Sequence, residues 1–358
     1  MEKVRVGVVG CGVVSNGTYL PQIVKMPNVE LVAVCDMYED RARAAYTRFG
    51  AREVYTDYDE MLERSEIDLV VNLTHIQAHY DINMRALRAG KHVYSEKTLA
   101  VTVDEASVLI EEARKRGLKL GAAAATMLSP VNRRIAELLR DGAIGKVNFV
   151  VAHHSHAGAA NFTFWTTDPT WFYKPGAGPV LDLGVYDLHT LTGLLGSARA
   201  VSAMSGVSVP FRTVRSGPVK GKVIDVEVDD NTLIMLDFGQ ATFAFVDATY
   251  CVQAQLGPRM QIFGSEGTIA VHERGAPHPL SVYRDDTRIN LSGWIDLDLP
   301  GEPPWSLPMG VQHMADCILH PEKELITTGE HARHVLEIIN KSYQSAREGR
   351  TLPITTTF

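Results

Sequence analysis

The sequence has few cysteines, no excess of basic residues and no apolar run long enough to span a membrane. Its 358 residues include 4 cysteines without CxxC spacing, so we expect reduced thiols in a cytoplasmic protein and no structural metal. The 35 lysines and arginines are outnumbered by 42 acidic residues, which gives a net charge of -7. Nucleic acids and anionic membranes bind basic faces, so this balance argues against both as partners. The first residues, Met1-Glu2-Lys3, do not resemble a signal peptide.

Strand and helix patterns alternate through residues 1–125. Thr102 followed by Glu105 predicts a capping box at the start of the last helix, and Gly117 stands at its C-cap. This alternation predicts a parallel sheet with helices on both faces, an α/β Rossmann domain that binds a dinucleotide. The expected strands are 4–9, 30–35, 53–56, 69–73, 92–95 and 118–125, and the expected helices are 20–26, 39–49, 58–64, 78–88 and 103–116.

Residues 126–358 show longer β runs and few helices. This pattern predicts an α+β domain with a large open, mostly antiparallel sheet that binds substrate. An open sheet needs its second face covered, so we expect a homodimer or homotetramer through it, while the C-terminal helix packs back on the first domain. The expected strands are 147–156, 200–208, 222–238, 241–254, 259–271 and 280–283, and the expected helices are 131–140, 181–195, 310–319 and 330–347.

A glycine-rich turn follows the first strand, in the segment Gly10-Cys11-Gly12-Val13-Val14-Ser15. A dinucleotide-binding unit consists of a strand, a turn of this kind, a helix and an acidic residue about 20 residues further on. Gly10 permits the sharp turn, Gly12 lets the pyrophosphate approach the backbone, and the helix starting near Ser15 points its N–H groups at the phosphates. The alternative is a glycine-rich turn in another kind of parallel-sheet protein.

Asp36 ends the second strand and bears on the choice of cofactor. A carboxylate there accepts hydrogen bonds from the ribose hydroxyls and repels a 2′-phosphate, which favours NAD over NADP. Arg41 and Arg43 lie one helical turn further on and keep NADP as the second choice.

Polar residues also follow the fourth and fifth strands, at the sheet edge where parallel sheets bind ligands. Lys97 is the main catalytic candidate, because an ammonium there can hydrogen-bond a substrate hydroxyl and stabilise the developing alkoxide. The alternative is a surface lysine that pairs with Glu96. The residues expected to bind the cofactor are Gly10, Gly12, Val13, Val14, Asp36, Thr74, His75, His79 and Glu96.

The second domain offers partners for Lys97 after the loop 176–179. If the next segment is helical, Asp182, Tyr186 and His189 fall at i, i+4 and i+7 on one stripe. An acid, a phenol and an imidazole on one stripe can transfer protons, although a buried polar seam is the common alternative. Gly184 inside this helix indicates close packing or a nearby ligand.

Histidines and aromatic residues give weaker candidates. His153, His154 and His156 are clustered, but no carboxylate stands near them in the sequence, so a partly buried strand is favoured over a metal site. A group of aromatic residues lies just before the 176–179 loop. These residues form either an apolar wall around a sugar ring or part of the ordinary core. That group comprises Trp165, Trp171, Phe172 and Tyr173, with Lys174 beside it.

Over essentially its whole length the chain resembles the glucose–fructose oxidoreductase, inositol dehydrogenase and MocA family (Gfo/Idh/MocA). The resemblance rests on the Gly10 turn, on Ala-Gly-Lys-His-Val-Tyr-Ser-Glu-Lys at 89–97, and on the segments 142–147, 176–189 and 264–268. It implies hydride transfer at a sugar or cyclitol carbon with NAD(P). It also implies that Lys97 and Asp182 are active-site groups and that the residue at Tyr186 transfers a proton.

The chain departs from the family pattern at three places. Thr98 replaces a proline after Lys97, and His75 replaces a proline after Thr74. Tyr186 and His189 stand where His and Asp are commoner, so which of them takes the proton is open. We expect Tyr186 as the proton donor and acceptor. The residues expected to contact substrate are Lys97, Trp171, Tyr173, Lys174, Asp182 and His189.

Two other functions fit the same residues. Some proteins of the family use bound NAD for redox-assisted elimination or glycoside cleavage, and others are sugar or nucleotide sensors without turnover. Retention of Lys97, Asp182 and Tyr186 argues against a sensor, because sensing needs no proton-transfer groups. The sequence leaves the sugar and the direction of reaction undetermined.

Overall fold

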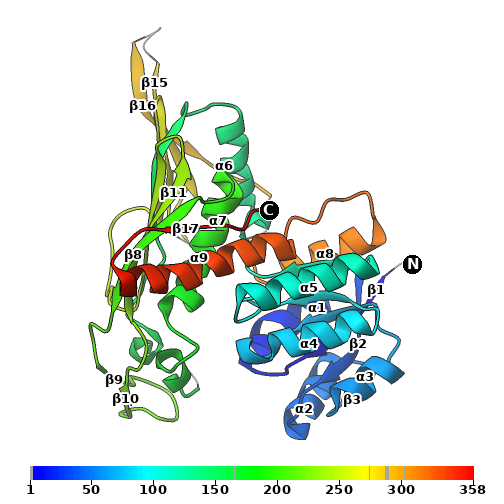
Figure 1. Ribbon diagram of the computed structural model, residues 1–358. Helices are drawn as coiled ribbons and strands as arrows, with labels where there is room; N and C mark the ends of the chain where they lie inside the picture. Colours follow the sequence, from blue (N-terminus) through cyan, green and yellow to red (C-terminus); the bar gives the residue numbers. More distant parts are fainter. Residues whose placement is uncertain (1–2, 164–166, 274, 287–289, 302–303) are drawn as a thin grey trace. The chain divides into compact units, whose positions relative to one another are not determined.

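The computed structural model describes residues 3–163, 167–273, 275–286, 290–301 and 304–358 (Figure 1). The chain divides into two compact units. Unit 1 comprises Met1–Leu128 and Trp305–Leu336, and unit 2 comprises Ser129–Pro304 and Glu337–Phe358. The domain boundary expected at residue 125 stays a prediction. In the described part of the chain, no helix has the length and apolar character needed to cross a membrane.

Unit 1 is built on a parallel sheet with the strand order β3-β2-β1-β4-β5-β6. The strand order reverses between β1 and β4, where open α/β sheets bind ligands beyond the carboxyl ends of their strands. The Rossmann architecture expected from the sequence is confirmed. The strands are β1 Val4–Val9, β2 Val29–Cys35, β3 Glu53–Tyr55, β4 Leu69–Asn72, β5 His92–Ser95 and β6 Leu120–Ala122.

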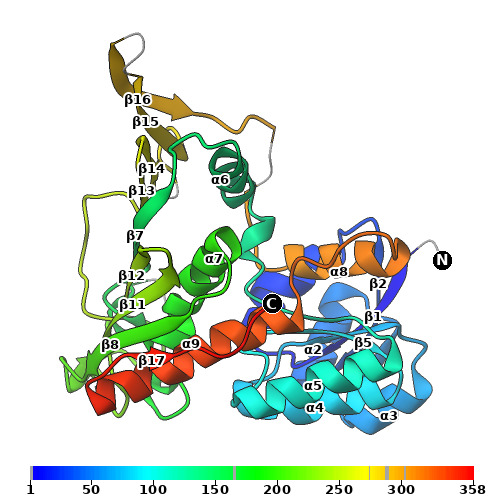
Figure 2. The same cartoon turned by 45° about the horizontal axis from the view of Figure 1, so that its top comes forward.

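Helices cover both faces of this sheet (Figure 2). One face carries α1 Leu20–Ile23, α2 Glu39–Phe49 and α8 Met309–Leu319, and the other carries α3 Tyr58–Arg64, α4 Ile76–Arg88, α5 Val103–Arg116 and the start of α9 Gly329–Glu348. Val311 and Met314 of α8 are fully buried in the core of unit 1. The capping box of Thr102 and Glu105 begins α5 as predicted.

The helix after β1 begins with a π-helical turn, Ser15–Tyr19, before it continues as α1. The sequence predicts an ordinary helix over residues 20–26. Pro21 explains the difference, because it has no N–H to donate to the carbonyl of Gly17 in a regular α-helix. Such turns are frequent at functional sites.

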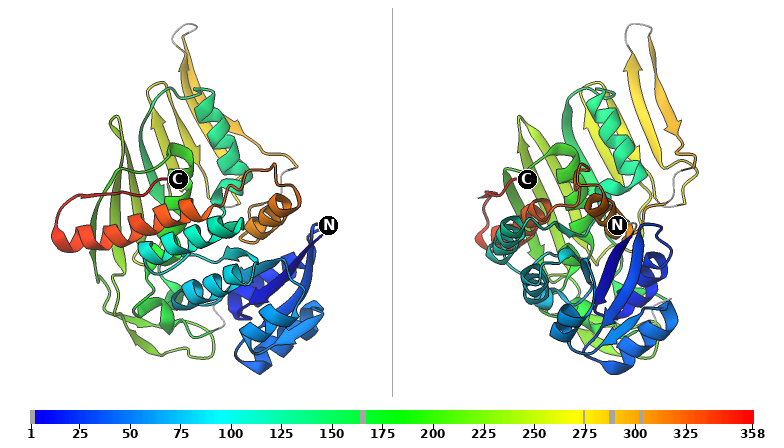
Figure 3. Two further views of the ribbon diagram at one scale, coloured as in Figure 1. Left: turned by 45° about the vertical axis from the view of Figure 1, so that its right-hand side comes forward. Right: turned by 90° about the vertical axis from the view of Figure 1, so that its right-hand side faces the viewer.

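Unit 2 is built on one large sheet with the order β16-β15-β14-β13-β7-β12-β11-β8-β17 among the described residues. Its neighbouring strands are antiparallel except for β12 and β7, and the β15–β16 hairpin extends beyond the rest of unit 2 (Figure 3). The mostly antiparallel sheet expected is confirmed. The strands are β7 Val147–His153, β8 Ala200–Gly206, β11 Asn231–Gly239, β12 Thr242–Thr249, β13 Met260–Gly264, β14 Gly267–Val271, β15 Leu280–Asp286, β16 Leu291–Leu297 and β17 Leu352–Pro353.

Two long β runs expected from the sequence are divided in the structure. The run 222–238 forms β10 Val223–Asp225, which pairs with β9 Phe211–Thr213, and then β11. The run 259–271 forms the hairpin of β13 and β14, because Ser265 and Glu266 make its turn. Composition alone does not show where a continuous apolar run turns back on itself.

The helices α6 Pro130–Arg140 and α7 Val185–Leu195 pack on one face of this sheet, and in the described part of unit 2 no helix covers its other face (Figure 2). Ile234 and Leu236 of β11 are buried, as expected for the strand positions that face these helices. The intervening residues of the sheet point away from the helices. The exposed apolar residues of this open face include Phe149, Met204, Leu233, Met235 and Phe243.

Candidate functional site

The turn after β1 has the geometry that the glycine pattern predicts. Gly10 adopts a φ of 89°, and a Cβ added there would lie 2.8 Å from the carbonyl oxygen of Leu73, so only glycine fits. A Cβ on Gly12 would meet no atom within 4 Å. Val13 and Val14 are 61% and 45% exposed. The outer side of the turn is therefore open to a ligand that approaches the backbone.

Asp36 ties this turn to the end of β2. Its Oδ2 accepts a hydrogen bond from the backbone N–H of Cys11 at 2.8 Å, and its Oδ1 accepts one from that of Tyr38 at 2.9 Å. Close by, the guanidinium of Arg41 lies 4.5 Å from the ring centroid of Tyr38, and Arg43 pairs with Glu39 at 2.7 Å. Both arginines that kept NADP as an alternative thus have partners on their own helix.

Two polar residues on the inner side of α4 connect the loops after β4 and β5. His79 is fully buried, with Nδ1 2.6 Å from the carbonyl oxygen of Thr98 and Nε2 3.0 Å from that of Thr74. Burial lowers the pKa of His79, and the carbonyls of Thr98 and Thr74 act in the opposite direction; the neutral ring has one N–H and donates it to one of these two carbonyls. One turn further on, the fully buried amide of Asn83 donates to the carbonyl oxygen of Leu99 at 3.3 Å. Both ring nitrogens of His79 face the chain's own carbonyls, so the structure supports a positioning role for it.

Glu96 anchors the backbone of Lys97. The Glu96 carboxylate is 9% exposed, and it accepts hydrogen bonds from the Tyr19 hydroxyl at 2.6 Å and from the Lys97 backbone N–H at 2.9 Å. Tyr19 is fully buried in the π-helical turn that follows the glycines. The Lys97–Thr98 peptide bond is cis, and the Lys97 side chain is half-buried. The glycine-rich turn and the candidate catalytic lysine are thereby linked within unit 1.

In unit 2, Asp182 lies in a π-helical turn, Val180–Gly184, that leads into α7. A Cβ on Gly184 would lie 2.9 Å from that of Ala248, which accounts for this glycine by close packing against β12. The Tyr250 hydroxyl donates to Oδ2 of Asp182 at 3.0 Å. Burial and the Asp182 charge raise the pKa of Tyr250 well above its usual value, so it stays a proton donor to the carboxylate. No motif or spacing in the sequence points to Tyr250.

The structure brings carboxylates to the histidine cluster, which differs from the expectation of isolated strand histidines. Nδ1 of His154 lies 3.3 Å from Oδ1 of Asp187, and Nδ1 of His153 lies 2.5 Å from Oδ2 of Asp247. The ring of Tyr186 stacks on that of His154, with centroids 5.3 Å apart. Among the described residues, no three histidine, cysteine or acidic side chains are arranged to hold a metal ion.

The expected single stripe of three polar residues is changed by the π-helical turn that precedes α7. Asp182 and Tyr186 are half-buried, whereas His189 is only 4% exposed. The three residues fall on one stripe only if residues 181–195 form a regular α-helix. The π-helical turn is wider, so Asp182 is rotated relative to the residues of α7. The substrate contact expected for His189 stays a prediction.

The aromatic residues before the loop 176–179 separate into exposed and buried members. Trp171 is 57% exposed and stacks on Phe172, whereas Tyr173 is fully buried and accepts a hydrogen bond from the Ala160 N–H at 3.0 Å. Lys174 pairs with Glu227. Trp165 lies outside the described residues. Trp171 is therefore the described member whose side chain is available to a ligand.

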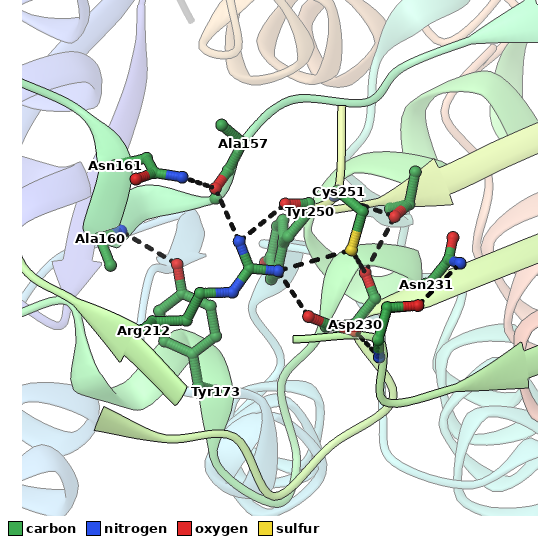
Figure 4. Close-up of polar contacts among 12 residues, drawn as sticks. Ala157, Ala160, Asn161, Tyr173, Arg212, Asp230, Asn231, Tyr250 and Cys251 are labelled. Carbon is green, nitrogen blue, oxygen red and sulfur yellow. Dashed lines mark hydrogen bonds and ion pairs between the residues drawn. The ribbon is translucent and has the colours of Figure 1, made fainter. Parts of the chain in front are cut away.

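A buried ion pair that the sequence analysis missed holds the backbone of Tyr250 (Figure 4). Arg212 and Asp230 are 5% and 0% exposed, and Nη2 of the arginine lies 2.5 Å from Oδ2 of the aspartate. Nη1 of Arg212 also donates to the carbonyl oxygen of Tyr250 at 3.0 Å, while the Tyr250 N–H donates to that of Asp230 at 2.8 Å. The tyrosine that contacts Asp182 is thus fixed from both sides.

Comparison with known proteins gives matches along most of the chain. A family model described as an oxidoreductase family with an NAD-binding Rossmann fold matches residues 4–124. A second model, the GFO/IDH/MocA C-terminal domain, matches residues 132–270.

Curated proteins and solved structures are similar over comparable lengths. A dTDP-3,4-didehydro-2,6-dideoxy-alpha-D-glucose 3-reductase of Streptomyces violaceoruber is 30% identical over 280 residues, covering 77% of this chain and 75% of the relative. A myo-inositol 2-dehydrogenase of Thermotoga maritima is 24% identical over 84% of this chain and 90% of the relative. A levoglucosan dehydrogenase in complex with NADH and L-sorbose has the same fold, with a TM-score of 0.85 at 19% identity over 99% of this chain and 100% of that one.

Proposed function

We propose an activity for this chain from one established premise: it belongs to the GFO/IDH/MocA family of NAD-binding oxidoreductases. The proposed reaction is hydride transfer between a nicotinamide cofactor and a secondary alcohol or ketone of a sugar, cyclitol or sugar derivative. The names of the relatives support this class of substrate, since they are reductases and dehydrogenases of sugars and of inositol. The four free thiols fit a reducing compartment, and we propose the cytoplasm.

NAD is the proposed cofactor, in preference to NADP. The residues of unit 1 fit it, because the open Cβ position of Gly12 leaves room for a pyrophosphate against the backbone. The buried carboxylate of Asp36 disfavours a 2′-phosphate at the end of β2, and Arg41 and Arg43 are engaged elsewhere. When bound, the nicotinamide accepts or supplies the hydride.

The anchoring of Lys97 is the observation that carries the proposal. Its backbone is held by Glu96, and Glu96 is held by Tyr19 of the turn at which the pyrophosphate would bind. We propose that the Lys97 ammonium hydrogen-bonds the reacting oxygen and stabilises negative charge on it. In unit 2, we propose that Asp182, kept in place by Tyr250, orients a sugar substrate and that the exposed ring of Trp171 covers one face of the sugar.

The test replaces Lys97 with methionine, which keeps the length of the side chain and removes the charge. Turnover should fall at least about 100-fold, on the scale of losing one stabilising donor, while NAD binding is unchanged. Lys91→Met at the opposite end of β5 is the matched control and should behave like the wild type. Nicotinamide absorbance would be followed with NAD and NADP against sugars, cyclitols and sugar acids, and cofactor binding by fluorescence.

Three outcomes would overturn parts of this proposal. Near-normal turnover by Lys97→Met contradicts the role of the ammonium. A preference for NADP contradicts the role of Asp36. NAD that stays bound through purification, with a sugar consumed but no net NADH, would indicate redox-assisted elimination or glycoside cleavage.

We also propose that the open face of unit 2 is covered by a second copy of this chain. It exposes a row of large apolar side chains on neighbouring strands, including Met235 of β11 and Phe243 of β12. Phe149 of β7 pairs with Phe243 and stacks on Phe263 with centroids 4.4 Å apart. A contiguous apolar sheet face of this kind is typical of an interface between subunits.

A further inference from the structure

The pair of His154 and Asp187 has the geometry of an oriented base. Nδ1 of His154 lies 3.3 Å from Oδ1 of Asp187. An ionised carboxylate only accepts hydrogen bonds, so the proton of a neutral imidazole belongs on Nδ1. Nε2 is then left as a bare acceptor. This is the arrangement in which a carboxylate fixes the tautomer of a histidine that takes protons from a substrate.

Asp187 has a cationic partner besides His154. It is fully buried, and no described group donates to its Oδ2. A buried carboxylate needs a countercharge, which Arg259 provides through Nη1 at 3.5 Å from Oδ1. His154 itself has a side chain 30% exposed, so the imidazole connects the buried acid to a surface that a ligand can reach.

The pair lies among the groups already proposed to handle substrate. Tyr186 stacks on the His154 ring, and His156 stacks on Tyr250, the donor to Asp182. Burial lowers the pKa of His156, while the nearby Asp182 raises it and His154 lowers it, so all three are close enough to interact. The titratable groups next to the His154 ring are Asp187, Tyr186 and His156. Asp247 accepts a hydrogen bond from the backbone N–H of His154, and Arg259 pairs with Asp187.

We propose that His154, oriented by Asp187, accepts the hydroxyl proton of the substrate during oxidation, in place of Tyr186 or His189. The inference rests on the proposed function and names the proton acceptor of that reaction. The O–H bond of the substrate hydroxyl breaks, and its proton forms an N–H bond at Nε2. The carbon that carries this hydroxyl loses a hydride to the cofactor, and the C–O bond becomes a carbonyl. The imidazolium then releases its proton to solvent, and reduction reverses these steps.

The chemistry favours an imidazole over a phenol at this position. A tyrosine ordinarily titrates near pH 10, far from neutral pH, whereas a histidine ordinarily titrates near 6.5. A base whose pKa lies near the working pH transfers protons most effectively. Stacked on the imidazole, Tyr186 would restrict the ring's rotation rather than accept the proton itself.

The central variant is His154→Asn, whose amide keeps a donor toward Asp187 but lacks a nitrogen at the Nε2 position. We expect kcat to fall about 100-fold or more with KM changed only a few-fold, the range for loss of a general base. The pH–rate profile should change shape, because the group that accepts the proton is missing. In His154→Gly, added imidazole should restore part of the rate. His153→Asn is the control, since this neighbouring histidine has a similar aspartate partner and points to the open face.

A second readout does not depend on turnover. In protein labelled with ¹⁵N-histidine, the His154 ring should show a protonated Nδ1 and a bare Nε2 at pH 8. Asp187→Asn presents an amide that can donate to Nδ1, so it should reverse this tautomer and lose as much kcat as His154→Asn. The double variant should lose no more than either single variant, because the two residues act as one unit.

The outcomes separate this inference from the proposed function. If His154→Asn keeps the wild-type kcat and pH profile while Lys97→Met is inactive, the inference is wrong and the proposed function stands. A bare Nδ1 in the wild type would also overturn the inference. If the wild-type protein oxidises none of the polyhydroxylated substrates with either cofactor, the proposed function fails, and the assignment of the proton acceptor fails with it.

Discussion

Replacing Asp230 with asparagine tests the buried ion pair beneath Tyr250 most directly. The substitution keeps the shape of the side chain but leaves the guanidinium of Arg212 buried without its countercharge. Asp230 also accepts the backbone N–H of Ser208 at 2.7 Å, so its loss affects two neighbouring segments. The backbone of Tyr250, which depends on both members of the pair, should loosen as well.

The expected cost follows from burial. Removing one partner of a buried pair typically costs about 3–5 kcal/mol, because the remaining charge stays desolvated. The matched control is Asp168→Asn in the same unit, where Lys222 and Asp168 form an ion pair with side chains 40% and 43% exposed. An exposed pair of this kind is worth about 0–1 kcal/mol.

Thermal unfolding and hydrogen exchange together measure this difference. For a unit of this size, a loss of about 3–5 kcal/mol lowers Tm by roughly 10 °C, and the control should lower it by at most about 4 °C. The amide of Tyr250, which donates to the carbonyl oxygen of Asp230, should exchange faster in the Asp230→Asn variant alone. Equal destabilisation by the two variants would refute the reasoning, because burial would then have no effect on the strength of the pair.

Two further predictions concern the C-terminal segment and the open face. Burial raises the pKa of Glu337, but hydrogen bonds from Lys341 and from Thr355 and its neighbour outweigh it and lower the pKa to about 2 from 4.5. The stability that ionised Glu337 contributes is therefore present above pH 4.5 and is lost as the pH falls toward 2. In denaturant titrations, Glu337→Gln should be about 3 kcal/mol less stable than the wild type at neutral pH and equal to it near pH 2. A constant difference across this range would contradict the reasoning. Light scattering should find the wild type as a dimer or tetramer. Met235→Glu should dissociate it, whereas Phe211→Glu on the separate β9 should not. A monomeric wild type would contradict the proposed interface.

Much of unit 1 could be predicted from the sequence because its signals are local. The bounds of α5 follow from the capping box at Thr102 and from Gly117 in the left-handed conformation, and both signals lie within a few residues of the helix. The helix expected at residues 20–26 is α-helical at Leu20–Ile23, but it is preceded by the π-helical turn Ser15–Tyr19 and ends earlier than expected. There, Pro21 acts on the hydrogen bonding of the preceding turn, which periodicity does not show.

The site could be predicted only where its residues have a fixed spacing. The roles of Gly10 and Asp36 follow from their distance along a βαβ unit, and the structure ties both to the same turn. Asp187 is 33 residues from His154, and their contact depends on how α7 packs against the end of β7. Arg212 could not be predicted, because the pattern Phe211-Arg212-Thr213 favours burial of the phenylalanine, whereas the structure exposes Phe211 and buries Arg212.

The buried polar residues of α4 have a consequence for how a ligand would bind. His79 and Asn83 can meet the carbonyls of Thr74, Thr98 and Leu99 in one alignment of the helix only, since a shift by one turn would leave these groups unsatisfied in an apolar interior. The loop that carries Lys97 is thus preorganised before any ligand arrives. Little conformational entropy remains to be lost on association, so more of the contact energy is available as affinity.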